Sequence, residues 1–204
     1  NIGIARSFTN LSITYFDQGK LDKAKKYLSK GLKIFTKYGD KRSVNLGNFE
    51  LSKFLQFEEN YNQGITSIKL AIDFFEEQND TVLLIRSYNR IARLYRLNND
   101  TKSAIVYLNK SLKLLKKLQN QKLSERTLIE HKLCTLDKSN SITYLEKFIS
   151  ETTDINLKAY IHFSLFINLK ENKKNNKSSA IKYYKEQFKK VNRFEYKYYL
   201  DLLN

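Results

Sequence analysis

Four arginines lie within eleven residues of this chain, and their spacing is its strongest chemical signal. A helix would align these polar side chains on one stripe, which consists of Arg86, Asn89, Arg93 and Arg96, with Arg90 beside them. Guanidinium groups on one stripe repel one another unless an anion or acidic side chains lie between them. Their planar forks suit a carboxylate or phosphate. The stripe therefore predicts an anion-binding site. The alternative is that acidic side chains elsewhere in the chain neutralise it, and the candidates are Glu50, Glu125 and Glu130.

The residues that enzymes need are missing or badly spaced. Six glycines are scattered along the chain and form no phosphate-binding loop. His131 and His162 lie far apart, with no acidic or cysteine ligand at metal-binding spacing. The single cysteine, Cys134, lies among leucines and is predicted to be a buried structural thiol. We therefore expect no catalytic residue, metal site, cofactor or enzymatic activity.

A helical hairpin positions the arginines. The apolar pattern predicts one helix over 83–97, a polar turn over 98–100 and a second helix over 101–118. The unit recurs at a step of forty residues, with small side chains at equivalent places: Ser12, Ser52 and Ala92 in the first helix, and Ala24, Gly64 and Ala104 in the second. Such a period predicts an all-α solenoid of stacked hairpins.

The residues at these places resemble the tetratricopeptide repeat. The first copy reads Phe8-x2-Leu11-Ser12-x2-Tyr15 followed by Ala24-x3-Leu28-x2-Gly31. Two departures are the period, which is usually about 34 residues, and the absence of proline. HEAT repeats have a period near forty, but the marker residues favour the tetratricopeptide interpretation. The resemblance implies a right-handed superhelical solenoid of about five antiparallel helix pairs plus a C-terminal helix, as in long-repeat arrays of bacterial sensor and regulator proteins.

We predict a single solenoid over 1–204. Its repeats span about 1–40, 41–80, 81–120, 121–152 and 153–193, and a terminal helix covers 194–204. The fourth repeat is short and degenerate, and the Lys/Asn-rich segment 171–178 is predicted to be a surface loop. The aromatic terminal helix is expected to continue the array or to form a homodimer contact. Because the chain contains no methionine and starts inside what resembles a repeat linker, we expect it to be part of a longer protein.

The resemblance also implies where a ligand binds, because the first helix of each repeat lines the concave groove in this family. Positions aligned with the arginine stripe add cations at Arg6 and Lys53 and apolar platforms at Phe16 and Phe49. The implied site therefore consists of Arg6, Phe16, Phe49, Lys53, Arg86, Asn89, Arg90, Arg93 and Arg96. The carboxylate clamp known in the family is not reproduced residue by residue.

The formal charge of +16 favours anionic partners. Part of it follows the outer side of one predicted helix and is expected to be a solvated face, made of Lys23, Lys26, Lys30, Lys33 and Lys37. The apolar runs are too short to cross a bilayer, so no membrane insertion is expected.

We therefore predict a protein- or peptide-binding module, the sensor or interaction region of a bacterial signalling or transcription-regulatory protein, which binds an acidic segment in its groove. One alternative is a structural scaffold or homodimerisation arm. A less favoured alternative is nucleic-acid binding through the basic surface, which lacks an aromatic stacking platform. A cytoplasmic location is favoured, and an extracytoplasmic sensor array stays open.

Overall fold

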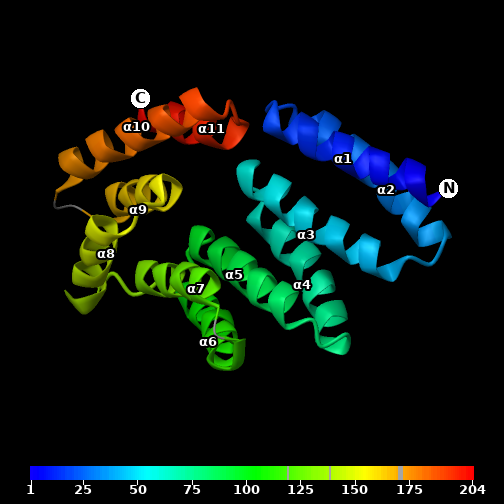
Figure 1. Cartoon of the computed structure of the whole chain (residues 1–204), viewed down its shortest axis with the longest axis horizontal. Helices are drawn as coiled ribbons and strands as arrows, with labels where there is room; N and C mark the ends of the chain where they lie inside the picture. Colours follow the sequence, from blue (N-terminus) through cyan, green and yellow to red (C-terminus); the bar gives the residue numbers. More distant parts are fainter. Residues whose placement is uncertain (119, 138, 170–171) are drawn as a thin grey trace. The chain divides into compact units, whose positions relative to one another are not determined.

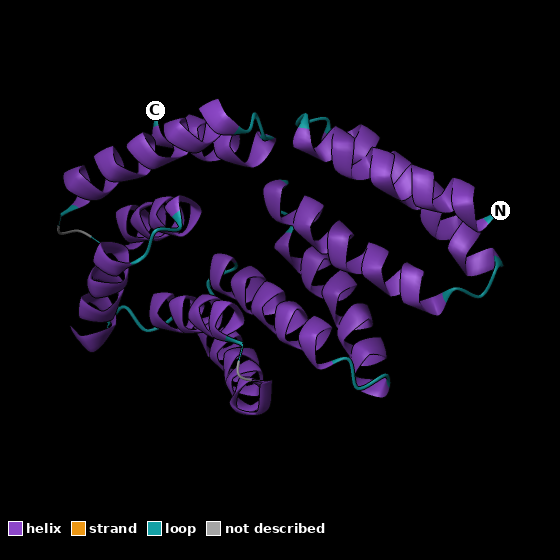
Figure 2. Cartoon of the chain, in the orientation of Figure 1, coloured by secondary structure: helices purple, strands orange, loops and turns teal. Residues whose placement is uncertain are grey.

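The chain folds into helices joined by short turns (Figures 1 and 2). The computed structural model describes residues 1–118, 120–137, 139–169 and 172–204, in which there are eleven helices and no strand. They are α1 (Ile2–Asp17), α2 (Leu21–Lys37), α3 (Lys41–Phe57), α4 (Tyr61–Glu77), α5 (Thr81–Leu97), α6 (Thr101–Leu118), α7 (Gln121–Leu133), α8 (Ser139–Glu151), α9 (Ile155–Asn168), α10 (Lys173–Lys190) and α11 (Phe194–Leu203). The predicted all-α fold of repeated helix pairs is confirmed.

The turns of the first repeats follow one another at intervals of twenty residues. One residue of each turn has a positive φ, and these are Gly19, Gly39, Glu59, Asn79 and Asn99. From the second of these turns onward, the next residue caps the following helix by accepting a hydrogen bond from a backbone N–H three residues later. The capping side chains are Asp40, Asn60, Asp80 and Asp100, and Asn120 caps α7 in the same way. Each cap satisfies an N–H that has no partner inside the helix, and so fixes where the helix begins.

Packing divides the chain into two compact units. The first contains Asn1–Phe16 and Lys20–Cys134, and the second contains Asp17–Gly19 and Thr135–Asn204. In the first unit each helix from α2 to α7 packs on the next, as Figure 1 shows. Helix α5 also contacts α3 and α7. The first helices of successive repeats therefore lie in one row, and their side chains share a surface.

Small residues let the helices of the first unit approach one another closely. The predicted markers Ser12, Ser52, Ala92, Ala24 and Ala104 are completely buried, and Gly64 is buried as well. At Gly47 an added Cβ atom would clash with the Leu32 side chain, which would have to move, so α3 packs closely against α2 at this position. Larger side chains fill the space between these contacts, and the core of the central repeats includes Ile68, Phe75, Ile91 and Leu94.

In the second unit α9, α10 and α11 pack around an aromatic cluster. The Tyr199 ring stacks on Tyr184 at 5.1 Å and lies 4.8 Å from Phe163. Leu203 is 1% exposed. Tyr199 and Leu203 of the terminal helix thus pack within this unit, whereas Leu202 is 48% exposed, and the homodimer contact stays a prediction. No helix in the described part of the chain has both the length and the apolar character needed to cross a bilayer.

The predicted loop over 171–178 is wrong from Lys173 onward. Helix α10 begins at Lys173, and residue 171 lies outside the described residues. Asn176 is buried, with its Oδ1 atom 2.8 Å from Nδ1 of His162 on α9, and Lys177 lies over the Phe166 ring. These contacts with α9 stabilise a helical segment whose composition is typical of a loop.

Candidate functional site

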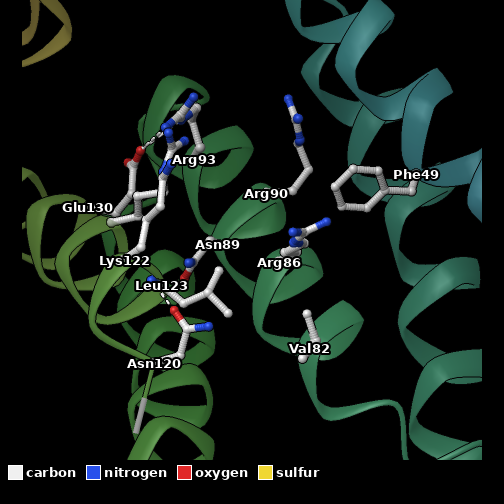
Figure 3. A pocket seen from close by; sticks show the side chains of 11 residues that line it. Phe49, Val82, Arg86, Asn89, Arg90, Arg93, Asn120, Lys122, Leu123 and Glu130 are labelled. Carbon is white, nitrogen blue, oxygen red and sulfur yellow. Dashed lines mark hydrogen bonds and ion pairs between the residues drawn. The ribbon is translucent and has the colours of Figure 1, made fainter. Parts of the chain in front are cut away.

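A pocket of about 470 Å³ lies on the shared surface of α3, α5 and α7 (Figure 3). Phe49 of α3 forms one side. Helix α5 contributes Val82, Arg86, Asn89, Arg90 and Arg93. Helix α7 and its cap contribute Asn120, Lys122, Leu123, Arg126 and Glu130. The pocket thus lies within the first unit and includes five of the nine residues predicted to bind a ligand.

Glu130 neutralises part of the arginine stripe. Its side chain is 3% exposed and accepts hydrogen bonds from two guanidinium groups. Arg93 donates from Nε to Oε1 at 2.7 Å and from Nη2 to the same oxygen, while Nη2 of Arg96 lies 3.5 Å from Oε2. For Arg93 and Arg96, the interpretation in which acidic side chains of another repeat neutralise the stripe is therefore correct. These contacts also fix α7 against α5.

Three other cations of the pocket are exposed and make no hydrogen bond or ion pair with any residue that the structure describes. They are Arg86 on α5 and Lys122 and Arg126 on α7, called the cationic trio below. Lys122 and Arg126 are four residues apart and so lie on one face of α7. Among the described lining residues there are five cations and a single carboxylate, which Arg93 and Arg96 already occupy. Their mutual repulsion favours an anion in the pocket.

Arg90 and Phe49 form the side of the pocket next to α3. The guanidinium carbon of Arg90 lies 5.3 Å from the centre of the Phe49 ring, within the range of a cation–π contact. Its Nη1 atom donates to Oε1 of Gln56 at 3.4 Å. Arg90 therefore shields part of the ring, which is half-buried in this structure. Phe49 thus lines the pocket beside cations, and its contact with a ligand stays a prediction.

Asn89 lines the pocket, but its amide joins three helices. Its Nδ2 donates to Oγ1 of Thr127 on α7 at 2.8 Å, and its Oδ1 accepts from Oγ of Ser111 on α6 at 3.1 Å. Thr127 and Ser111 are completely buried. Because both ends of the amide are hydrogen-bonded to the protein, Asn89 positions the base of the pocket.

The other predicted residues lie outside the pocket. Arg6 is exposed on α1, and Arg96 does not line the pocket but pairs with Glu130. Phe16 is 1% exposed and stacks on Phe54 at 4.8 Å, so its ring is not the exposed platform that we expected. Lys53 places its ammonium 4.5 Å from the centre of the same ring. Phe16 and Lys53 therefore pack α1 on α3.

Comparisons with known proteins agree with this architecture. Two segments, residues 5–38 and 85–117, match the family model of the tetratricopeptide repeat. These two segments, and the helical-repeat fold of the chain, are of the tetratricopeptide type. Its fold is similar to the apo form of RapI, with a TM-score of 0.75 and 18% identity over 92% of this chain and 70% of that chain. It is also similar to a putative kinesin light chain from Podosopora anserina with nearly identical TPR-like repeats, with a TM-score of 0.57 and 13% identity over 100% of this chain and 96% of that chain. No curated protein matches the sequence.

This repeat type supports a role as a protein–protein interaction module. Tetratricopeptide proteins are typically interaction scaffolds without enzymatic activity.

The sequence interpretation missed two members of the cationic trio, Lys122 and Arg126, although one signal was present. Arg126 lies forty residues after Arg86, so it occupies the same repeat position. The fourth tetratricopeptide repeat has weak apolar markers, and its groove positions were therefore not aligned with the others. Extending the period by one step finds Arg126. Lys122 follows because it lies one helical turn earlier on α7.

Cys134 is the last residue of the first unit and is buried, as predicted. Burial raises the pKa of its thiol from the ordinary 9.0 to about 12, and the Glu130 carboxylate adds to this while Arg96 opposes it. The thiolate is the reactive form. At pH 8 we expect iodoacetamide to modify the native protein about a thousandfold more slowly than the protein in guanidinium chloride. Mass spectrometry of timed samples measures both rates, and similar rates would mean that Cys134 is accessible.

Proposed function

We propose that this tetratricopeptide protein binds an anionic peptide segment of a partner protein in the pocket of α3, α5 and α7. The proposal rests on the cationic trio, whose charges have no partner among the described residues, in a pocket whose carboxylate is already occupied. Carboxylates of a bound segment would supply the missing negative charge. Guanidinium forks on two helices allow a bidentate contact with each of two acidic groups.

We further propose that this binding serves a bacterial signalling or transcription-regulatory protein, as its sensor or interaction region. The similarity of fold to RapI supports a regulatory role. The excess of positive charge supports rapid association with an acidic partner, because the field of a basic protein steers anions toward it.

A peptide selection tests the proposed function. Peptides selected from a random display library on the wild-type protein should be rich in Asp and Glu. Each is then labelled with fluorescein, and its affinity is measured by fluorescence anisotropy. The variant Arg86→Ala/Arg126→Ala should bind about 100-fold more weakly, because each lost charge-assisted hydrogen bond costs about 1.5 kcal/mol.

A charge-matched variant separates a local contact from a general effect of charge. Lys113 and Lys117 are exposed on α6, outside the pocket, so Lys113→Ala/Lys117→Ala removes the same net charge. We expect this variant to keep its affinity within about twofold, since exposed charges at a distance are screened by salt. Equal losses of peptide affinity in the two double variants would contradict the proposed function. Selected peptides that are not enriched in acidic residues would contradict it as well.

A further inference from the structure

We infer that the bound segment is amphipathic, with an aliphatic or aromatic side chain close to its acidic residue. This inference rests on the proposed function and specifies its ligand. It follows from a second set of lining residues, the apolar wall, which consists of Phe49, Val82 and Leu123. The acidic residue of the segment contacts the cationic trio, and its apolar neighbour contacts this wall.

Val82 is the accessible part of the apolar wall. Its side chain belongs to an element whose apolar residues are mostly buried, yet it is 36% exposed at the pocket. Val82 and Arg86 are four residues apart on α5 and so lie on the same face of the helix. A ligand that contacts Arg86 therefore passes over Val82. An apolar side chain placed there removes hydrocarbon surface from water, which favours binding.

The apolar wall also strengthens the ionic contact next to it. Hydrocarbon from the ligand over Val82 and Leu123 would exclude water from one side of Arg86. The attraction between a guanidinium and a carboxylate increases as the local dielectric constant falls. A segment with acidic groups alone leaves the wall in water and gains neither effect. The pocket thus favours an acidic residue with an apolar neighbour over an equally charged polar segment.

The dimensions of the pocket limit the spacing of these two residues. In Figure 3 Val82 lies at one end of the pocket and Arg93 and Glu130 at the other, with Arg86 between them. Val82 and Arg93 are eleven residues apart, so this part of α5 is about 16 Å long. An extended chain advances about 3.4 Å per residue. The apolar and acidic residues of the ligand should therefore lie within about five residues of each other.

A double-mutant cycle tests the inference. The probe is the tightest peptide from the library selection, labelled with fluorescein, with a second version in which its apolar residue is serine. In the protein, Val82→Thr replaces one methyl by a hydroxyl at an exposed position. We expect this variant to bind the parent peptide about fivefold more weakly and to bind the serine peptide as well as wild type does. The matched control is Val106→Thr on α6, where the side chain is 56% exposed outside the pocket, and its affinity should not change.

The outcomes separate this inference from the proposed function. Acidic peptides could bind more weakly to Arg86→Ala/Arg126→Ala than to wild type but equally well to Val82→Thr. In that case the pocket binds anions, and the inference of an amphipathic ligand is wrong. Selected peptides with no apolar residue within about five positions of an acidic one would overturn it as well. The inference would also be overturned if tetraglutamate displaced the labelled peptide as well as the unlabelled parent peptide does. If no acidic peptide is selected, the proposed function and the inference both fail.

Discussion

Glu130→Ala should lower the free energy of unfolding by about 3–5 kcal/mol, the usual cost of breaking a buried ion pair from one side. The carboxylate is 3% exposed between two guanidinium groups, and the Arg96 side chain is only 9% exposed. Removing the carboxylate takes away the ion pair of Arg96, whose charge is mostly buried. It also removes the hydrogen bonds of Arg93, which fix α7 against α5. The contact between these helices should therefore weaken more than any other in the first unit.

Urea denaturation followed by circular dichroism measures this loss. Because the chain forms two compact units, a second measurement must show which unit loses stability. Hydrogen exchange of the backbone amides of α5 and α7 assigns the loss to the first unit. The control is Glu77→Ala, which removes an exposed carboxylate with no partner among the described residues and should change stability by less than about 0.5 kcal/mol. If Glu130→Ala costs as little as this control, Arg93 and Arg96 do not depend on Glu130.

The period of the sequence predicts the fold well, because it depends on local rules that repeat. Ser12, Ser52 and Ala92 mark the places where helices approach closely, and all three are completely buried. Asp80 and Asp100 cap α5 and α6, so α5 begins at Thr81, two residues before the predicted start, and α6 begins at Thr101 as predicted. Helix boundaries set by capping and by small contact residues need no knowledge of distant parts of the chain.

The neutralised part of the arginine stripe was not predictable, because it depends on tertiary contacts. Glu50, Glu125 and Glu130 were all candidates by sequence, and only packing places Glu130 between Arg93 and Arg96. The same reason explains the wrong loop prediction. Lys and Asn residues favour a loop locally, but Asn176 contacts His162 on α9 and is buried in α10.

Groove positions near a helix end were also misjudged, and Phe16 shows why. Helical spacing places Phe16 on the same stripe as Ile13, which is 38% exposed, whereas Phe16 is 1% exposed. The difference comes from α3, whose Phe54 and Phe57 lie against the Phe16 ring at 4.8 and 5.4 Å. Periodicity gives the side of a helix on which a residue lies. It does not say which neighbouring helix covers that side at a given position along the helix axis.

Phe16→Ala should therefore lower the free energy of unfolding by about 3–5 kcal/mol, as expected for a large cavity in a packed core. The rings of Phe54 and Phe57 would lose their aromatic contacts, and Lys53 would lose the ring beneath its ammonium. Urea denaturation measures the loss. The control is Tyr38→Ala, since Tyr38 is 54% exposed, and this variant should stay within about 0.5 kcal/mol of wild type.

The milder variant Phe16→Leu separates packing from binding, because it keeps most of the buried volume and the protein folded. Its affinity for the selected peptide should stay within about twofold of wild type, since the ring is closed to solvent in this structure. Phe49→Leu should instead weaken binding, because Phe49 lines the pocket and supports Arg90. If Phe16→Leu weakened binding as much as Phe49→Leu, the ring would have to become exposed when the ligand binds. The groove would then extend from α5 and α3 to α1, as the tetratricopeptide resemblance first implied.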